Sequence, residues 1–203
     1  MKVLVACEFS GIVREAFRKL GHDAVSCDLL PSEQEGPHLQ CDIRDVDMKG
    51  YDLLIAHPDC TYLANSGVHW LGRQEGRTEK MKKAAAFFKW FLEAPVPKIC
   101  VENPVMHKYA LEVIGRKHDQ TIQPYQFGHD ASKRTCLWLK GLPKLEGTKL
   151  ISPCHGVGMK MYYANQTPSG QNKLGPSPDR WKERSRTYKG IAEAMAEQWG
   201  DLK

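Results

Sequence analysis

The chain has 203 residues, of which 41% are hydrophobic and 26% charged, with a formal net charge of +5. This length and composition are typical of a soluble globular protein with one ordinary domain. No apolar run is long enough to span a membrane, and the first residues are too few and too soon followed by Glu8 to form a signal peptide. We therefore expect a cytoplasmic protein without a membrane partner.

Apolar runs and helical patterns alternate along the first 140 residues. The run 2–8 is followed by a helical pattern over 12–20 that ends at Gly21. A second helix, from about 78 to 94, repeats apolar side chains at i, i+3, i+4 and i+7. Further strands are predicted at 23–30, 51–57, 98–101, 121–127 and 135–139, and further helices at 105–115 and near the C-terminus. This alternation predicts an α/β fold with a mostly parallel sheet and helices on both faces.

Positive charge is concentrated in the second half of the chain. Between positions 129 and 189 there are twelve lysines and arginines and four acidic residues, a net charge of +8, which leaves −3 for the remainder. Such a segment favours a polyanionic partner. A lysine-rich solvated surface would have the same composition, so that interpretation stays open.

Seven cysteines are scattered at positions 7, 27, 41, 60, 100, 136 and 154. No two have the spacing Cys-x-x-Cys, so the sequence predicts neither a disulfide framework nor a zinc site. Cys154 stands beside His155, but this spacing fits no standard metal site, and we expect no bound metal. Most of the thiols are expected to act as small hydrophobic groups.

Polar and reactive residues follow the predicted strands. In parallel sheets, ligands bind outside the carboxyl ends of the strands, and that is where these residues fall. Gly11 allows the backbone to approach a small molecule closely, and Asp28 has the position of an acid that binds a ribose. A structural turn with a capping aspartate would have the same pattern. The residues concerned are Glu8-Phe9-Ser10-Gly11, Asp28, Pro58-Asp59-Cys60 and Glu102-Asn103.

Cys60 is the best candidate for a nucleophile. It follows a strand and a stiff Pro58-Asp59 pair, and Glu102 ends a neighbouring strand. A thiolate with a carboxylic acid suits covalent attack on an electron-poor ring, because the acid protonates or hydrogen-bonds a ring nitrogen. Acyl transfer would more often use a Cys–His pair, and since His57 lies in the same motif, a Cys–His hydrolase stays open.

With these motifs in this order, the chain resembles the cytosine-5 DNA methyltransferase family, in a short form similar to those of bacteriophages and prophages. The resemblance covers nearly the whole chain. Residues 8–11 resemble the first cofactor motif, Asp28-Leu29 the ribose-binding acid and its neighbour, and Asp42-Ile43 the pair that contacts adenine. Pro58-Asp59-Cys60 resembles the nucleophile loop, Glu102-Asn103 the pair that holds the target base, residues 128–134 the basic motif, and residues 186–199 the last motif.

The resemblance implies a Rossmann-like fold that binds S-adenosylmethionine and methylates cytosine in DNA, in a bacterial host cell. Cys60, Glu102, Asn103 and Arg134 would be catalytic, and the cofactor would contact residues 8–11, Asp28, Leu29, Asp42, Ile43 and Pro58. The target cytosine must be flipped out of the duplex or be single-stranded. DNA contacts are expected from Lys133, Arg134, Arg180, Lys182, Arg184 and Arg186, and aromatic residues that include Trp181 either stack on bases or fill a small core.

The resemblance also implies a division of the chain into three parts. Residues 1–142 would form the catalytic and cofactor-binding domain, 143–181 a small basic recognition region, and 182–203 a C-terminal helix that packs back on the catalytic domain. The oligomeric state and the recognition sequence are not predicted.

Three departures from the family pattern shape the prediction. One is the recognition region, which has only about 40 residues between Leu142 and Trp181, whereas the family's is much larger. Asp59 stands where the family usually has proline, and a carboxylate beside the thiol would raise its pKa. Val13 and Arg14 stand where further glycines are common. A binding protein with weak or no turnover, and a methyltransferase for RNA or a free nucleotide, are therefore the alternatives.

Overall fold

A computed structural model describes residues 1–158 and 160–202 and contains a seven-stranded sheet in the order β3-β2-β1-β4-β5-β7-β6. The first five strands of this order are parallel, whereas β7 runs antiparallel to both of its neighbours. This confirms the expected α/β, Rossmann-like architecture. The strands are β1 (Lys2–Ala6), β2 (Asp23–Asp28), β3 (His38–Gln40), β4 (Leu53–Ala56), β5 (Lys98–Pro104), β6 (Gln120–Ile122) and β7 (Thr135–Lys140).

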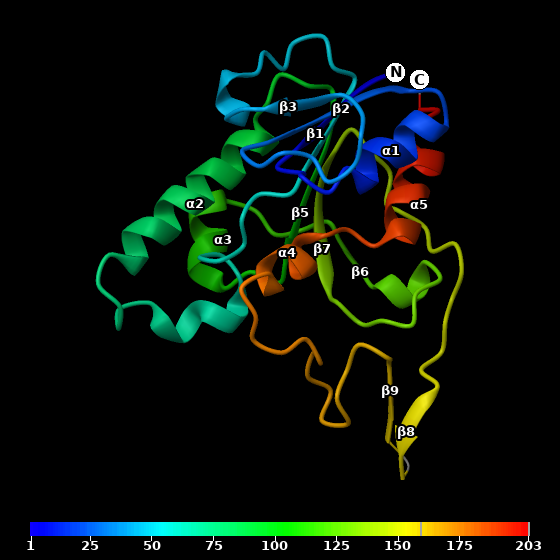
Figure 1. Cartoon of the computed structure of the whole chain (residues 1–203). Helices are drawn as coiled ribbons and strands as arrows, with labels where there is room; N and C mark the ends of the chain where they lie inside the picture. Colours follow the sequence, from blue (N-terminus) through cyan, green and yellow to red (C-terminus); the bar gives the residue numbers. More distant parts are fainter. Residues whose placement is uncertain (159, 203) are drawn as a thin grey trace.

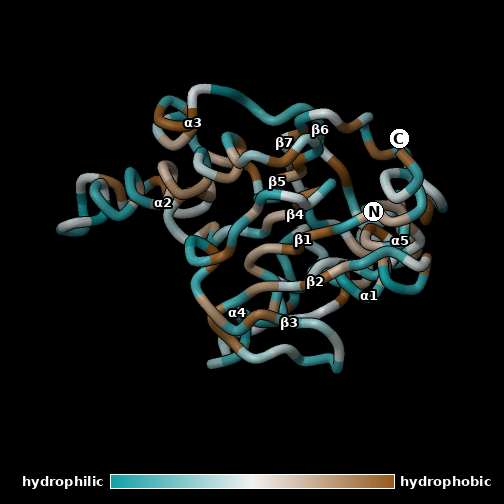
Figure 2. Tube along the Cα trace, turned by 90° about the horizontal axis from the view of Figure 1, so that it is seen from above, coloured by the Kyte–Doolittle hydropathy of each residue, from teal (hydrophilic) through white to brown (hydrophobic). Residues whose placement is uncertain are grey.

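Helices cover both faces of the sheet (Figure 1). On one face lie α1 (Ile12–Lys19) and α5 (Lys189–Trp199), which contact each other. On the other face lie α2 (Arg77–Leu92) and α3 (Lys108–Ile114). Alternate side chains of each central strand enter two separate hydrophobic clusters, one under each helix pair. Figure 2, from above, shows the strands crossing the molecule between these layers.

Two expected elements differ from the structure. The helix predicted over 105–115 starts only at Lys108, because Val105 and Met106 are held extended against residues 64 and 65. The His107 ring then caps the helix by accepting a hydrogen bond from the Ala110 N–H. The strand predicted over 121–127 ends at Ile122, since Pro124 begins a 3₁₀ turn, η3 (Pro124–Gln126).

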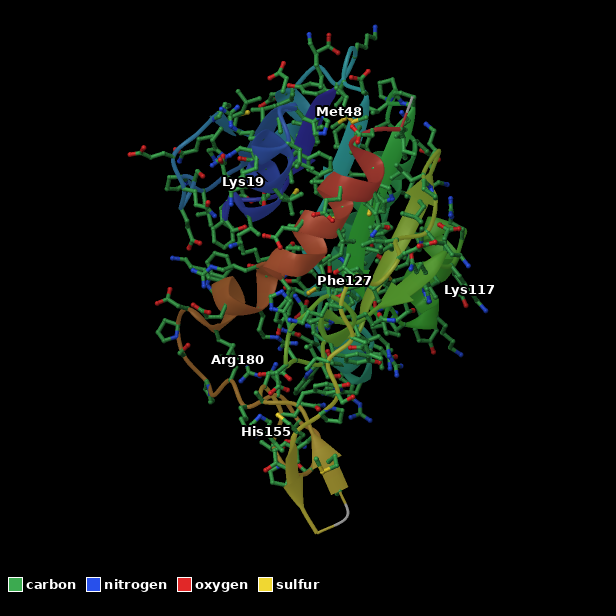
Figure 3. The ribbon with its side chains drawn as sticks, turned by 90° about the vertical axis from the view of Figure 1, so that its right-hand side faces the viewer. Lys19, Met48, Lys117, Phe127, His155 and Arg180 are labelled. Atoms are coloured by element: carbon green, nitrogen blue, oxygen red, sulfur yellow. The ribbon has the colours of Figure 1, made fainter. Side chains whose placement is uncertain are left out.

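A small hairpin extends away from the sheet after β7. Its strands are β8 (His155–Val157) and β9 (Lys160–Tyr162), which pair with each other in a separate two-stranded sheet. Figure 3 shows His155 at the base of this hairpin. The chain then returns through α4 (Arg180–Ser185), so the boundary expected between 181 and 182 falls inside a helix. The three-part division itself stays a prediction. No described helix has the length and apolarity needed to cross a membrane.

Candidate functional site

A cavity of about 630 Å³ lies at the carboxyl ends of β1, β2 and β4. It sits where the strand order reverses, between β1 and β4, which is the usual ligand crevice of a doubly wound sheet. Its size is that of a small-molecule site, and most of its surface is apolar. Its walls come from the three strand ends, from residues 41–44, from Phe87 of α2 and from two side chains of α4.

Five of the residues expected to contact a cofactor line this cavity: Phe9, Asp28, Leu29, Asp42 and Ile43. Burial raises the pKa of Asp28, and its carboxylate also accepts a hydrogen bond from the Leu30 N–H at 2.9 Å. Hydrogen bonds from Arg44 lower the pKa of Asp42 to about 2. The cavity therefore offers two carboxylates among apolar side chains.

The other residues of the first motif lie behind the cavity wall. The Glu8 carboxylate is buried and accepts hydrogen bonds from the Val13 and Arg14 N–H groups, at 2.7 and 3.2 Å, and from the Ser10 hydroxyl. A carboxylate at these free N–H groups stabilises the start of α1. Gly11 has φ 70°, and a Cβ there would lie 2.7 Å from the Arg14 guanidinium. Together with Pro58, these residues do not line the cavity, and their roles as cofactor contacts stay predictions.

One side of the cavity is formed by α4, which lies near the C-terminus and far along the chain from β1 and β2. The Trp181 ring lies 5.9 Å from the Phe9 ring, centroid to centroid, and Ser185 also lines the cavity. Arg186 holds this segment in place through an ion pair of 2.7 Å to Glu33. No local sequence signal links Trp181 to the cavity, because the contact depends on how distant segments fold together.

Cys60 lies in a short loop that follows β4. The loop is held by Asn103, whose Nδ2 donates a hydrogen bond of 2.8 Å to the Pro58 carbonyl. Asp59 shapes it further, since its Oδ1 accepts hydrogen bonds from both the N–H and the hydroxyl of Thr61. The half-buried thiol thus occupies a defined position next to the end of β5.

His57 and Glu102 form a buried hydrogen-bonded pair beside this loop. Ala56 of β4 is in register with Val101 of β5, so the residues that follow each of them lie side by side. His57 Nδ1 is 2.8 Å from Glu102 Oε2. Burial by itself would raise the pKa of Glu102, but the hydrogen bond from His57 and the charge of Lys133 outweigh it and hold that pKa below its usual value.

Burial raises the pKa of the Cys60 thiol, and the negative charges of Asp59 and Glu102 raise it further. Arg184 and Lys133 oppose this effect. Lys133 is therefore a cation of the Cys60–Glu102 site, and its Nζ also donates a hydrogen bond to the Arg184 carbonyl. Arg134, expected in a catalytic role, is exposed at the start of β7, and that role stays a prediction.

Replacing Asp59 with asparagine should make Cys60 more reactive. Asparagine keeps an oxygen that can accept from Thr61 but removes the charge, so the pKa of the thiol falls towards its ordinary value. We expect alkylation of Cys60 by iodoacetamide at neutral pH to become about two- to tenfold faster, measured by mass spectrometry. Asp47→Asn is the control, because Asp47 Oδ1 accepts a hydrogen bond from the Lys49 N–H just as Asp59 Oδ1 accepts one from the Thr61 N–H. Equal rates for both variants and wild type would contradict the assigned effect of Asp59.

The basic residues expected to bind DNA differ in whether an acidic side chain pairs with them. Arg186 is paired with both Glu33 and Glu183, and Lys182 lies 3.5 Å from Asp179. Arg184 is exposed, and no ion pair to it occurs within the described part of the chain. Contact with DNA stays a prediction for all of them, and for Arg180.

The structure brings together three potential metal ligands, Asp130, Cys154 and His155, which the spacing of residues in the sequence did not predict. His155 Nε2 and the Cys154 thiol lie 2.9 and 3.4 Å from Asp130 Oδ2, and the three ligand atoms lie within 4.8 Å of one another. Asp130 comes from a loop 24 residues before Cys154, so no motif joins them. Asp130 Oδ1 also accepts a hydrogen bond from the Ala164 N–H. These hydrogen bonds join the loop that carries Asp130 to the start of the β8–β9 hairpin at residues 154 and 155 and to Ala164, just after its end.

No protein-family model and no curated protein matches the chain. Among solved structures, it is similar to a protein named as a DNA modification methyltransferase from an E. coli prophage, at 12% identity over 74% of this chain and 52% of that one, with a TM-score of 0.47. It is also similar to a methyltransferase of Entamoeba histolytica, at 13% identity over 74% and 57%, with a TM-score of 0.49.

A third similar structure is the 1,6-didemethyltoxoflavin-N1-methyltransferase of Burkholderia thailandensis with bound S-adenosylhomocysteine, at 10% identity over 68% and 69%, with a TM-score of 0.38. The chain spans just over half the length of the first two structures. Similarity at this level concerns the arrangement of strands and helices and decides neither substrate nor cofactor.

Proposed function

We propose that the chain is an S-adenosylmethionine-dependent methyltransferase that methylates carbon 5 of cytosine in DNA through a covalent adduct with Cys60. The observation that carries this proposal is the meeting of two sites at one edge of the sheet. A cavity fit for a nucleoside lies at the ends of β1 and β2, and Cys60 and the His57–Glu102 pair lie at the ends of β4 and β5.

The cavity suits S-adenosylmethionine in the chemistry of its walls. Asp28 supplies an acceptor for ribose hydroxyls, and Ile43 and Phe87 supply apolar surfaces for a flat base. When bound, this cofactor supplies an electrophilic methyl group. Phe9 and Trp181 pack against each other at one side of the cavity and add apolar surface to its wall.

In this mechanism, Cys60 Sγ as thiolate would form a bond to carbon 6 of the ring. The Glu102 carboxyl, after taking up a proton, would donate it to the ring nitrogen at position 3 and recover it when the ring is restored. The electron pair displaced by this addition would make carbon 5 nucleophilic, and carbon 5 would take up the methyl group, with S-adenosylhomocysteine as the other product. Loss of the carbon 5 proton to a base then lets the thiolate leave and restores the aromatic ring. Lys133 and Arg184 stabilise the thiolate by their charge.

DNA is the proposed substrate because the positive charge of the segment 129–189 exceeds what a mononucleotide needs. Transfer of labelled methyl groups from S-adenosylmethionine to DNA, RNA and dCMP compares the three substrate classes directly. We expect transfer to DNA. Transfer to RNA or dCMP alone would replace the substrate, and transfer to none would remove the enzyme proposal.

Asp28→Ala tests the cofactor cavity. A hydrogen bond to a carboxylate contributes about 1.5–3 kcal/mol, so S-adenosylhomocysteine should bind about ten- to a hundredfold more weakly in isothermal titration calorimetry. Asp23→Ala, at the opposite end of the same strand, is the control and should bind as wild type does. Equal binding by Asp28→Ala and wild type would exclude Asp28 as a cofactor contact.

A binding protein without turnover is the second candidate, and the raised pKa of Cys60 favours it. This candidate predicts binding of DNA and S-adenosylhomocysteine, no methyl transfer, and no change in DNA affinity for Cys60→Ala.

A further inference from the structure

Within the described part of the chain, two buried side-chain atoms have no hydrogen-bond partner: His57 Nε2 and Asn103 Oδ1. Both belong to the site at the ends of β4 and β5: His57 is paired with Glu102, and Asn103 is the residue after Glu102. Buried polar atoms nearly always have a partner, so each exception asks for an explanation, such as a catalytic role, a water molecule or a bound ligand. The position of the two atoms points to a ligand of this site.

His57 differs in this respect from other histidines near the sheet. Both ring nitrogens of His107 are within hydrogen-bond distance of protein atoms, the Ala110 N–H and the Tyr62 carbonyl. The same holds for His38, through Ser26 and Leu30. The side chain of His57 is only 7% exposed, yet one of its nitrogens is paired and the other is not.

The hydrogen bond of His57 Nδ1 determines whether Nε2 of the same ring is a donor or an acceptor. An ionised carboxylate accepts hydrogen bonds and cannot donate them, so Nδ1 carries the hydrogen in the pair with Glu102. In the neutral ring, Nε2 is then an acceptor that requires a donor. His57 is also part of the cavity wall. A water molecule can supply this donor, and so can a hydroxyl or amino group of a molecule in the cavity.

We propose that His57 links the cavity to Glu102, with Nδ1 positioning the carboxylate for the target base and Nε2 accepting a hydrogen bond from the cavity's ligand. This inference rests on the proposed function, since it takes S-adenosylmethionine as that ligand. His57 is a positioning residue with respect to the base and a binding residue with respect to the cofactor. Each role belongs to a different nitrogen, so the two roles are separable by substitution.

The test uses two substitutions that each retain one nitrogen position. His57→Asn has an amide close to the position of Nδ1, and His57→Gln has one close to the position of Nε2. For His57→Asn we expect S-adenosylhomocysteine to bind about tenfold more weakly in calorimetry, with kcat at saturating cofactor nearly unchanged. For His57→Gln we expect near-normal cofactor binding and kcat lower by about tenfold or more. His22→Asn, at the amino end of β2, is the matched control.

A structural role for His57 would weaken binding and turnover together in both variants, which would overturn the inference, as would wild-type behaviour of both. The Nε2 resonance in ¹⁵N spectra of the wild-type imidazole gives a readout independent of folding defects. It should shift to that of a hydrogen-bonded acceptor when S-adenosylhomocysteine is added, and an unchanged resonance at saturation also overturns the inference. If wild type does not bind this compound at all, the proposed function fails first, and the ligand contact of His57 fails with it.

Discussion

Replacing Cys60 with serine is expected to abolish both methyl transfer and the covalent complex with DNA that contains 5-fluorocytosine. A serine hydroxyl is far less nucleophilic than a thiolate, and no other cysteine occupies the loop after β4. We expect a loss of at least about a thousandfold in turnover, since removal of a nucleophile commonly costs that much or more. Gel electrophoresis under denaturing conditions detects the complex, and scintillation counting measures transfer.

The rate of complex formation by wild type also has an expected pH dependence. Burial, Asp59 and Glu102 raise the pKa of Cys60, so only a minor fraction is thiolate at neutral pH. The rate should therefore increase as the pH rises towards the pKa of the thiol. Cys154→Ser, which changes an exposed cysteine away from the cavity, should behave as wild type. A covalent complex with Cys60→Ser would mean that another residue is the nucleophile.

Replacing Arg14 with methionine is expected to lower the free energy of unfolding by about 3–5 kcal/mol, the usual effect of removing one partner of a buried charged network. Arg14 is completely buried on α1 and forms an ion pair of 2.8 Å with Glu15. Its guanidinium donates hydrogen bonds to acceptors that would lose their partner: the Ser26 and Ser32 hydroxyls and the carbonyls of Gln34, Glu35 and Pro37.

Urea denaturation followed by far-UV circular dichroism measures this loss. Arg18→Met is the matched control, because Arg18 lies on the same helix, is 38% exposed and has only a longer ion pair of 3.7 Å with Glu15. It should change stability by less than about 1 kcal/mol. A similar small change for Arg14→Met would show that the buried network contributes little net stability.

Arg14 also explains one departure from the family pattern that the chain resembles. Arg14 stands where further glycines are common in the family, and its side chain fills the space beneath the loop 32–37. That loop in turn contacts the turn after β1, through the Glu33 N–H to the Phe9 carbonyl and Gln34 to the Ser10 carbonyl. The buried arginine therefore supports the wall from which Phe9 enters the cavity.

Local sequence patterns predicted most of the elements, because apolar periodicity and helix-ending residues act over a few positions. The helix expected over 78–94 is α2 at Arg77–Leu92, and the run 135–139 is β7. Two predicted elements had wrong bounds, because other interactions opposed the structure that the apolar periodicity favoured. Pro124 ended β6 early, and pairing of residues 105 and 106 with the chain after Cys60 delayed α3.

The sequence by itself determined that reactive residues follow apolar strands, and parallel strands bring such residues to one edge of a sheet. It did not determine which of them meet. Three features depend on the tertiary structure. The antiparallel strand β7 lies between β5 and β6, Trp181 of α4 lines the cavity, and His57 pairs with Glu102. The contacts between the loop after β4 and the end of β5 join residues 45 positions apart, where no local propensity acts. Only the tertiary structure, which buries both faces of the sheet at once, decided them.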